Sequence, residues 1–274
     1  MAEHRRARRS ALTAIVAVAA LGVLSGLAAA ALGDTQAPAT TASAVPVVTV
    51  TAEPANDPIT APSVEPSITT AEVEVSPSFD LDARSIDDPS SAWVVVNKHR
   101  PLDPATWAPP ELERIPGGSE MTPEAAAALI TMRDAAADAG AGFSIGTAYR
   151  SHGFQAGLYA DYVAQWGRER ADTFSARAGH SEHQTGLAAD VYQSSACRLK
   201  PCFGEEPAGV WISEHGHEYG FITRYPDGLA DVTGYRYEPW HVRYVGVDLA
   251  THMHDEGIAT LEELFGLEPA PTYQ

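Results

Sequence analysis

The chain has 274 residues, with 36 Asp and Glu against 18 Lys and Arg, and a formal net charge of −18. A chain this acidic lacks the positive footprint that phosphate binding requires, which argues against nucleic acid as a partner. The charge does not identify a partner, because acidic surfaces also keep secreted proteins soluble.

Residues 1–33 have the layout of a secretory signal peptide. A basic stretch at residues 4–9 precedes an uncharged apolar run at residues 11–33, which ends in small residues. The run also exceeds the roughly 20 apolar residues that span a bilayer, so a retained anchor with its basic end inside is equally compatible. Both alternatives place the rest of the chain outside the cytoplasm, either secreted or anchored to the cell membrane.

Residues 34–84 are expected to form a linker. Ala, Thr, Val, Pro and Ser dominate them up to residue 77, and prolines recur throughout. Proline fixes φ and lacks the amide donor, so neither a helix nor a central strand persists there. We therefore predict a semi-rigid disordered tether, followed by one globular domain over residues 85–267 and a C-terminal tail over residues 268–274.

Within the predicted domain, helices and short strands do not alternate regularly enough for a doubly wound sheet. Thr122 followed by Pro123 is a strong helix start, and Gly140 is a helix end. We expect strands over 94–96, 143–149, 187–192, 221–224 and 237–244, and helices over 122–139, 154–169, 210–219, 247–256 and 261–265. This pattern favours the α+β class, with a small antiparallel sheet covered by helices.

The only two cysteines, Cys197 and Cys202, lie five positions apart. A local disulfide that closes a small loop suits an exported protein. The alternative, half of a zinc site, would need a second ligand pair, and the chain has no further cysteine to supply one. We therefore predict the disulfide.

Three segments concentrate polar residues that a core would not favour: 181–190, 238–241, and 149–151 with Gln155. Zinc hydrolases commonly use three ligands drawn from His, Asp and Glu, and leave a fourth position for water. His183, Asp190 and His241 would form such a set. Glu238, three residues before His241, is then the natural general base for the attacking water.

Residue types and spacing alone do not decide whether these residues form a metal site. A single exposed histidine is usually a surface residue, and an aspartate at the end of a strand often forms a turn. The spacing is also not one of the common helical zinc motifs, in which two histidines lie at i and i+4. Glu182 and His180 flank a candidate ligand, where they either shape the loop or support the ligands from behind. Arg243 is expected to pair locally with an acid, and a contact with substrate is the alternative.

The two main motifs resemble those of the VanY-like family of zinc D-alanyl-D-alanine carboxypeptidases. They read Ser181-x-His183-x-x-Gly186-x-Ala188-x-Asp190 and Glu238-x-Trp240-His241, and the stretch Tyr149-Arg150-Ser151 with Gln155 is similar to an upstream signature of that family. The resemblance covers about residues 90–250. It implies a compact α+β domain, one zinc ion, and the C-terminal D-alanine of peptidoglycan stem peptides as the group removed.

Carried over to this chain, the resemblance implies specific roles. The zinc ligands would be His183, Asp190 and His241, the catalytic base Glu238, and the substrate contacts Arg150, Ser181 and Gln155. Arg150 would hold the terminal carboxylate of the substrate, because a planar guanidinium binds a carboxylate through two charge-assisted hydrogen bonds.

Two groups of alternatives remain at the level of sequence. An L,D-carboxypeptidase, a D,D-dipeptidase or a stem endopeptidase would share the same zinc centre and differ in the shape of the pocket. A non-catalytic wall-binding module with a structural zinc ion is a different class of function. Glu238 argues against that module, because a structural site needs no base and usually has four protein ligands.

Overall fold

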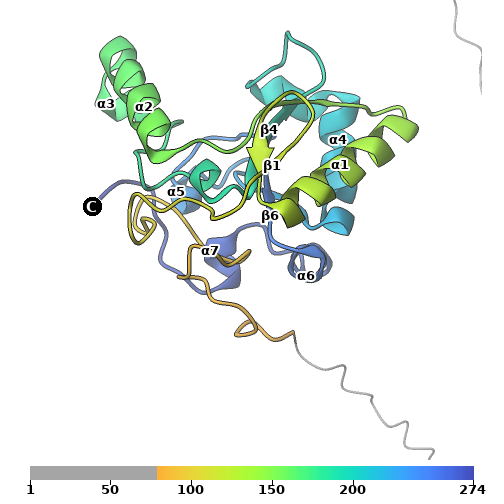
Figure 1. Ribbon diagram of the computed structural model, residues 1–274, viewed down its shortest axis with the longest axis horizontal. Coiled ribbons are helices and arrows are strands. Elements are labelled where there is room, and N and C mark those ends of the chain that lie inside the picture. The colour runs from red at the N-terminus through yellow and green to blue at the C-terminus, as the bar shows by residue number, and fades with distance from the viewer. Residues whose placement is uncertain (1–78) are drawn as a thin grey trace, which may run out of the picture. The chain divides into compact units, whose positions relative to one another are not determined.

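The computed structural model describes residues 79–274 (Figure 1). The predicted signal or anchor at residues 1–33, including the proposed membrane tether at residues 11–33, and residues 34–78 of the predicted linker lie outside the described residues. In residues 79–274, no helix is both long enough and apolar enough to cross a membrane.

The centre of the domain is a four-stranded antiparallel sheet in the order β3-β4-β6-β5. Its strands are β3 (Ser144–Thr147), β4 (Ala188–Tyr192), β5 (Phe221–Thr223) and β6 (His241–Tyr244). A separate two-stranded ladder joins β1 (Glu113–Arg114) to β2 (Glu120–Met121). The two central strands, β4 and β6, are buried along almost their whole length, so the polar residues on them need partners inside the domain.

Helices surround this sheet, which confirms the predicted α+β class. The α-helices are α1 (Pro123–Asp138), α2 (His152–Trp166), α3 (Arg168–Ala171), α4 (Pro207–His215), α5 (Ala230–Thr233), α6 (Val247–Glu256) and α7 (Leu261–Leu264). Three 3₁₀ helices, η1 (Glu182–Thr185), η2 (Pro201–Glu205) and η3 (Gly216–Tyr219), connect them. α1 buries an Ala, Leu and Met face against the core, whereas Gln155 is the only fully buried residue of α2.

Two predicted strands differ from the structure. Residues 94–96 are buried but irregular, because the carbonyl groups of this segment accept hydrogen bonds from arginine side chains instead of a neighbouring strand. The Val94 carbonyl bonds Arg243, and the Val95 carbonyl bonds Arg100. The strand predicted over 237–244 begins only at His241, whose amide donates to the Glu238 carbonyl across a turn. Pro239, inside that turn, has no amide to give to a ladder.

Residues beyond the predicted bounds of 85–267 also pack against the domain. Phe79 stacks on His252, with ring centroids 4.3 Å apart. Near the other end, the Tyr273 hydroxyl accepts a hydrogen bond of 2.8 Å from the Arg177 amide, and Lys98 donates to the Pro271 carbonyl at 2.9 Å. Aromatic and backbone contacts therefore attach both ends of the described segment to the core.

Candidate metal centre and catalytic cavity

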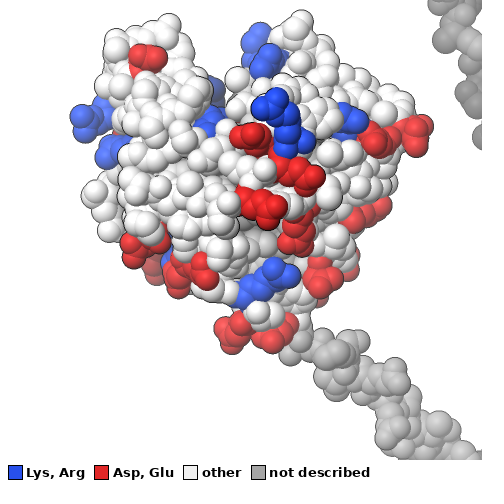
Figure 2. All heavy atoms as spheres, in the orientation of Figure 1, with Lys and Arg blue, Asp and Glu red and all other residues white. Residues whose placement is uncertain are grey.

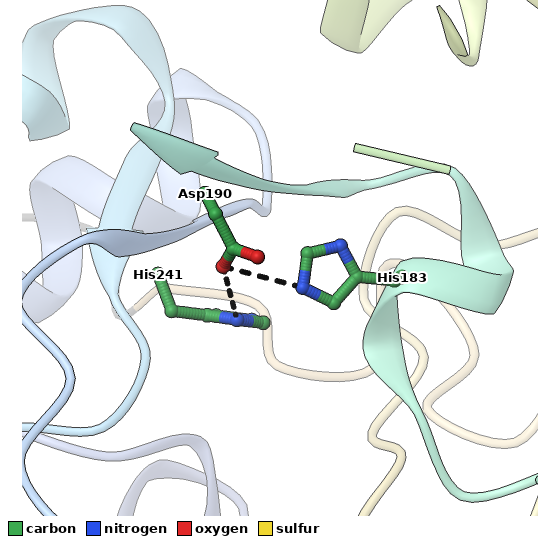
Figure 3. Close-up of side chains that lie close together, drawn as sticks. All are labelled: His183, Asp190 and His241. Carbon is green, nitrogen blue, oxygen red and sulfur yellow. Dashed lines mark ion pairs between the residues drawn. The ribbon is translucent and has the colours of Figure 1, made fainter. Parts of the chain in front are cut away.

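Two neighbouring strands and a short 3₁₀ helix bring the three candidate ligands together (Figure 3). Asp190 on β4 lies directly opposite His241, the first residue of β6, in the antiparallel register. His183 is on η1, which ends at Gly186 in the left-handed conformation, with φ of 72°. A glycine permits this turn at little cost, and the turn leads the chain from η1 into β4.

The ligand atoms of these three residues face a common point. Asp190 Oδ1 lies 3.3 Å from His183 Nε2 and 3.4 Å from His241 Nδ1, and the three ligand atoms all lie within 4.8 Å of one another. The other ring nitrogens have partners behind them, because His183 Nδ1 contacts the Ala148 carbonyl at 2.7 Å and His241 Nε2 contacts Glu182 at 3.3 Å. Such contacts fix which nitrogen faces a metal ion. Two imidazoles and one carboxylate with one open side suit a catalytic metal.

The charges in the group favour an added cation. Burial lowers the pKa of His183 to about 4, which keeps its imidazole neutral. Although burial raises the pKa of Asp190, its interactions with His183, His241 and Arg150 hold it well below its usual range. Burial also lowers the pKa of His241, but hydrogen bonds to Asp190 and Glu182 outweigh it and raise the pKa to about 9. The carboxylates of Asp190 and Glu182 thus favour positive charge beside His241, which a divalent cation can supply.

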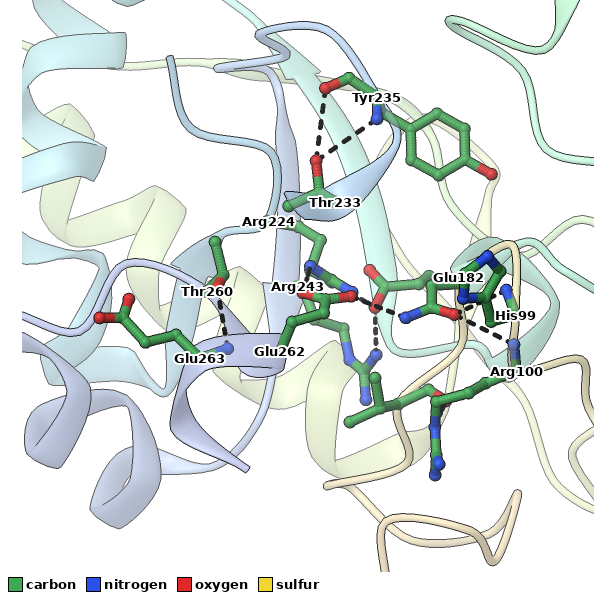
Figure 4. Close-up of polar contacts among 12 residues, drawn as sticks. His99, Arg100, Glu182, Arg224, Thr233, Tyr235, Arg243, Thr260, Glu262 and Glu263 are labelled. Atoms are coloured by element: carbon green, nitrogen blue, oxygen red, sulfur yellow. Dashed lines mark hydrogen bonds and ion pairs between the residues drawn. The ribbon is translucent and has the colours of Figure 1, made fainter. Parts of the chain in front are cut away.

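A fully buried network of charged side chains (Figure 4) contacts His241 through Glu182. Glu182 accepts hydrogen bonds from Arg243 at 2.6 Å and from Arg224 at 2.8 Å. Arg224 also forms two hydrogen bonds with Glu262 of α7, at 2.7 and 2.9 Å. The two carboxylates and the two guanidinium groups balance in charge, and the remaining oxygen of Glu182 faces His241. Glu182 therefore supports the metal centre from behind.

The sequence indicates some members of this network and not others. Of the two alternatives for Glu182, its contact with His241 favours support of the ligands from behind, and Arg243 pairs with an acid as expected. Arg224 and Glu262 were not identified from the sequence. Their signal is weak, because one arginine directly after an apolar strand and one glutamate within a short helix are also common on surfaces.

Glu238 lies on the turn before β6 and is 7% exposed. Its nearest charged partner is Arg236, whose Nε is 3.9 Å from Glu238 Oε1. Burial, with a further contribution from Asp190, raises the pKa of Glu238 to about 8. A carboxyl group that exchanges its proton near neutral pH suits general acid–base chemistry.

The three candidate ligands and Glu238 line one cavity of about 380 Å³. Phe154, Leu158, Tyr162 and Trp166 of α2 also line it, and this spacing of four residues places them along one face of the helix. In the face shown in Figure 2, basic side chains lie mostly in the upper part, around α2 and α3 and also beside α4, while acidic side chains predominate lower down. The acidic character of the chain is therefore uneven, and one wall of the cavity lies in the more basic part.

The residues expected to contact substrate occupy different positions. Arg150, which lines the cavity, donates to Gln155 Oε1 at 2.9 Å and to Asp190 Oδ2 at 3.3 Å. Gln155 is fully buried behind Arg150, and its amide group donates to the Ala176 carbonyl at 2.6 Å. Ser181, at the start of η1, lines the cavity but is only 3% exposed.

A disulfide joins Cys197 and Cys202, as predicted from their spacing. It closes a loop between β4 and α4, outside the motifs that supply the candidate ligands. One residue of this loop, Leu199, lines the same cavity as the metal centre.

Comparisons with known proteins agree with this geometry. The VanY family model, described as D-alanyl-D-alanine carboxypeptidase, matches residues 118–247. The chain is 38% identical over 192 residues to YodJ of Bacillus subtilis (strain 168), covering 66% of this chain and 69% of that protein.

Two solved structures are also similar. The LdcB LD-carboxypeptidase has 38% identity and a TM-score of 0.59, covering 65% of this chain and 87% of that chain. The vancomycin-resistance D,D-pentapeptidase VanY, a mutant in complex with Zn(II), has 30% identity and a TM-score of 0.55, covering 63% and 97% of the two chains.

Proposed function

The chain belongs to the VanY family of D-alanyl-D-alanine carboxypeptidases, and on that basis we propose that it is a zinc peptidase that removes the C-terminal D-alanine from peptidoglycan stem peptides. The observation that carries this proposal is the convergence of His183, Asp190 and His241 in one cavity with Glu238. The three-residue donor set leaves room for water and substrate, and Glu238 supplies the base that a purely structural site does not need.

His183, Asp190 and His241 would hold one zinc ion. When bound, zinc polarises the scissile carbonyl and lowers the pKa of water at the open position. The contacts of His183 with the Ala148 carbonyl and of His241 with Glu182 keep the correct ring nitrogen directed inward. The protein thus contributes a rigid and largely dry set of donors.

Glu238 is the group that moves the proton. As a carboxylate it takes a proton from the attacking water, and it then donates that proton to the nitrogen of the departing D-alanine. No hydrogen bond to another side chain of the described residues restrains Glu238, since its closest charged partner lies 3.9 Å away. Its carboxyl group is therefore free to serve both steps.

Arg150 would anchor the terminal carboxylate of the substrate. Its Nε is occupied by Gln155, and Nη1 is near Asp190, so the guanidinium is held in place before substrate arrives. We propose that Gln155 positions Arg150 and that Ser181, on the cavity wall, contacts the substrate. Such fixed orientation reduces the entropy cost of binding.

Replacing Arg150 by alanine is expected to raise KM by about 10-fold to 150-fold for peptides with a free C-terminal carboxylate, since hydrogen bonds to charged groups contribute about 1.5–3 kcal/mol. The measurement is steady-state kinetics on one stem peptide with a free or an amidated C-terminus. The amidated peptide has no terminal carboxylate for Arg150 to bind, so Arg150→Ala should hydrolyse it almost as fast as wild type does. Equal losses for both peptides would count against carboxylate recognition by Arg150.

Removal of the metal is expected to abolish peptidase activity, and added zinc should restore it. The test is incubation of the purified protein with a chelator, followed by metal analysis and assay before and after addition of zinc. Full activity in protein shown to contain no metal would contradict the proposed zinc dependence.

The decisive test of function is digestion of purified muropeptides of defined stem length, with the products identified by mass. Loss of one alanine from pentapeptide stems supports D,D-carboxypeptidase action. The similarity to the LdcB LD-carboxypeptidase favours a second candidate, loss of the terminal D-alanine from tetrapeptide stems. Release of a dipeptide or cleavage within the stem would instead indicate a dipeptidase or an endopeptidase.

We further propose that the chain acts outside the cytoplasm, with residues 1–33 as export signal or anchor and residues 34–84 as tether. The disulfide supports this location, because disulfides persist in oxidising compartments. Fractionation of cells that express the full chain would show whether the protein is released or stays with the membrane.

A further inference from the structure

The disulfide-closed loop, residues 197–202, is firmly anchored at its base. β4 ends at Tyr192, and the Gln193 side chain accepts a hydrogen bond of 3.0 Å from the Ala208 amide of α4. Within the loop, the Cys197 amide donates to Ser194 Oγ at 3.2 Å. Phe203, just after the second cysteine, is fully buried in the core. The loop therefore has a fixed base and an exposed tip.

The tip of the loop carries Leu199 in an unfavourable conformation. Its φ is +54°, and it is the only non-glycine residue with positive φ in the described part of the chain. Left-handed backbone brings the Cβ of an L-residue close to its own carbonyl group, so the conformation costs energy. Leu199 is also 44% exposed, so a large part of its apolar side chain faces solvent. Strain of this kind concentrates at functional sites.

The side chains of the two residues beside Leu199 make contacts outside the cavity. The Arg198 guanidinium lies over the Tyr192 ring, 4.7 Å from its centroid, and fills the space beside Gly146, where a Cβ atom would lie 3.3 Å from Arg198 Nη2. Lys200 donates to the Ala196 carbonyl at 2.7 Å. Of these three tip residues, only Leu199 lines the catalytic cavity.

The loop and helix α2 form opposite sides of the cavity entrance. In Figure 1 the teal loop beside α4 and the green α2–α3 pair rise on the two sides of the sheet, and in Figure 2 a notch separates them. Leu199 lines the cavity from one side, and the apolar face of α2, beginning at Phe154, lines it from the other. Both side chains are exposed to solvent, Phe154 by 60%. An apolar group of a substrate would fit between them.

We propose that the disulfide-closed loop is a substrate-binding element, which holds Leu199 at the cavity entrance as an apolar contact for the aliphatic part of the stem peptide. Opening the disulfide then raises KM without weakening metal binding. This inference rests on the proposed function, because it takes the stem peptide as the occupant of the cavity.

The test compares wild-type protein with Leu199→Gly, the double variant Cys197→Ser/Cys202→Ser, and the control Val210→Ala, which shortens an exposed apolar side chain of α4 outside the cavity. Leu199→Gly removes the apolar contact. It also removes the strain of the left-handed conformation, which glycine adopts at little cost, so the variant should fold at least as well as wild type. Each protein is assayed for kcat and KM on the stem peptide that wild type hydrolyses, and for zinc affinity by chelator competition.

We expect KM to rise about tenfold in Leu199→Gly and in the double serine variant, which is the size expected when a pocket loses an apolar contact. We expect kcat and zinc affinity to change less than twofold in both, and Val210→Ala to behave as wild type. Reducing the disulfide of wild type with a phosphine, in the presence of excess zinc, should raise its KM. The same treatment should not change the KM of the double serine variant, which has no disulfide to reduce.

An unchanged KM in Leu199→Gly, with wild-type hydrolysis intact, would overturn this inference and leave the proposed function in place. A loss of zinc affinity equal to the rise in KM would also overturn it, because the loop would then act on the metal centre. If zinc-loaded wild type hydrolyses no stem peptide, the proposed function and this inference both fail.

Discussion

Replacing Glu238 by alanine is expected to lower kcat by about two to four orders of magnitude, the usual contribution of a positioned general acid–base group. The variant can no longer take a proton from the attacking water or return it to the leaving amine. Metal binding should change little, because the Glu238 carboxylate is not one of the three groups that converge on the centre. The measurements are kcat on a stem peptide and zinc content by metal analysis.

Two controls sharpen this test. Glu238→Gln keeps the shape of the side chain but cannot accept the proton, so it should lose about as much activity as the alanine variant. Glu214→Ala removes an exposed acid of α4 outside the cavity and should leave kcat unchanged. Turnover by Glu238→Ala at the wild-type rate, with zinc bound, would show that another group acts as the base.

The candidate metal centre could be anticipated because its residues lie in two short motifs that resemble those of a known family, whereas residue types and spacing alone do not decide the matter. Asp190 and His241 each lie in a short motif, and both motifs fall in or beside strands whose apolar pattern is readable. The sequence does not contain the register that places these two residues opposite each other. That register follows from burial of both faces of β4 and β6, which makes a slip of one residue costly.

Other parts of the fold depend on contacts between distant residues. Arg224 and Glu262 are 38 residues apart, and no local pattern indicates that they pair. Residues 94–96 look like a strand because they are apolar, but their carbonyl groups are satisfied by arginine side chains. Propensity describes a residue in its own segment, whereas these contacts depend on which segments meet in the folded core.

The second large effect is expected from Arg224→Met, which removes one of the two cations from the buried network. Glu262 would lose its two hydrogen bonds to Arg224, and Glu182 would lose one of its two guanidinium partners. Breaking a buried ion pair on one side costs about 3–5 kcal/mol, because a desolvated charge is left without compensation. Denaturant unfolding of the metal-free protein should show this loss, since bound metal would add its own stabilisation.

The matched double variant Arg224→Met/Glu262→Met separates charge balance from packing. It leaves Glu182 and Arg243 as a neutral pair, still bonded at 2.6 Å, so it should recover most of the stability that the single variant loses. Arg133→Ala, which breaks an exposed pair with Asp134, should cost no more than about 1 kcal/mol. A double variant as unstable as Arg224→Met would mean that contacts other than charge balance stabilise this part of the core, such as the packing of Arg224 or the hydrogen bond that Asn97 donates to Glu262 at 2.9 Å. Because Glu182 joins this network to His241, zinc affinity should fall in the single variant and recover in the double one.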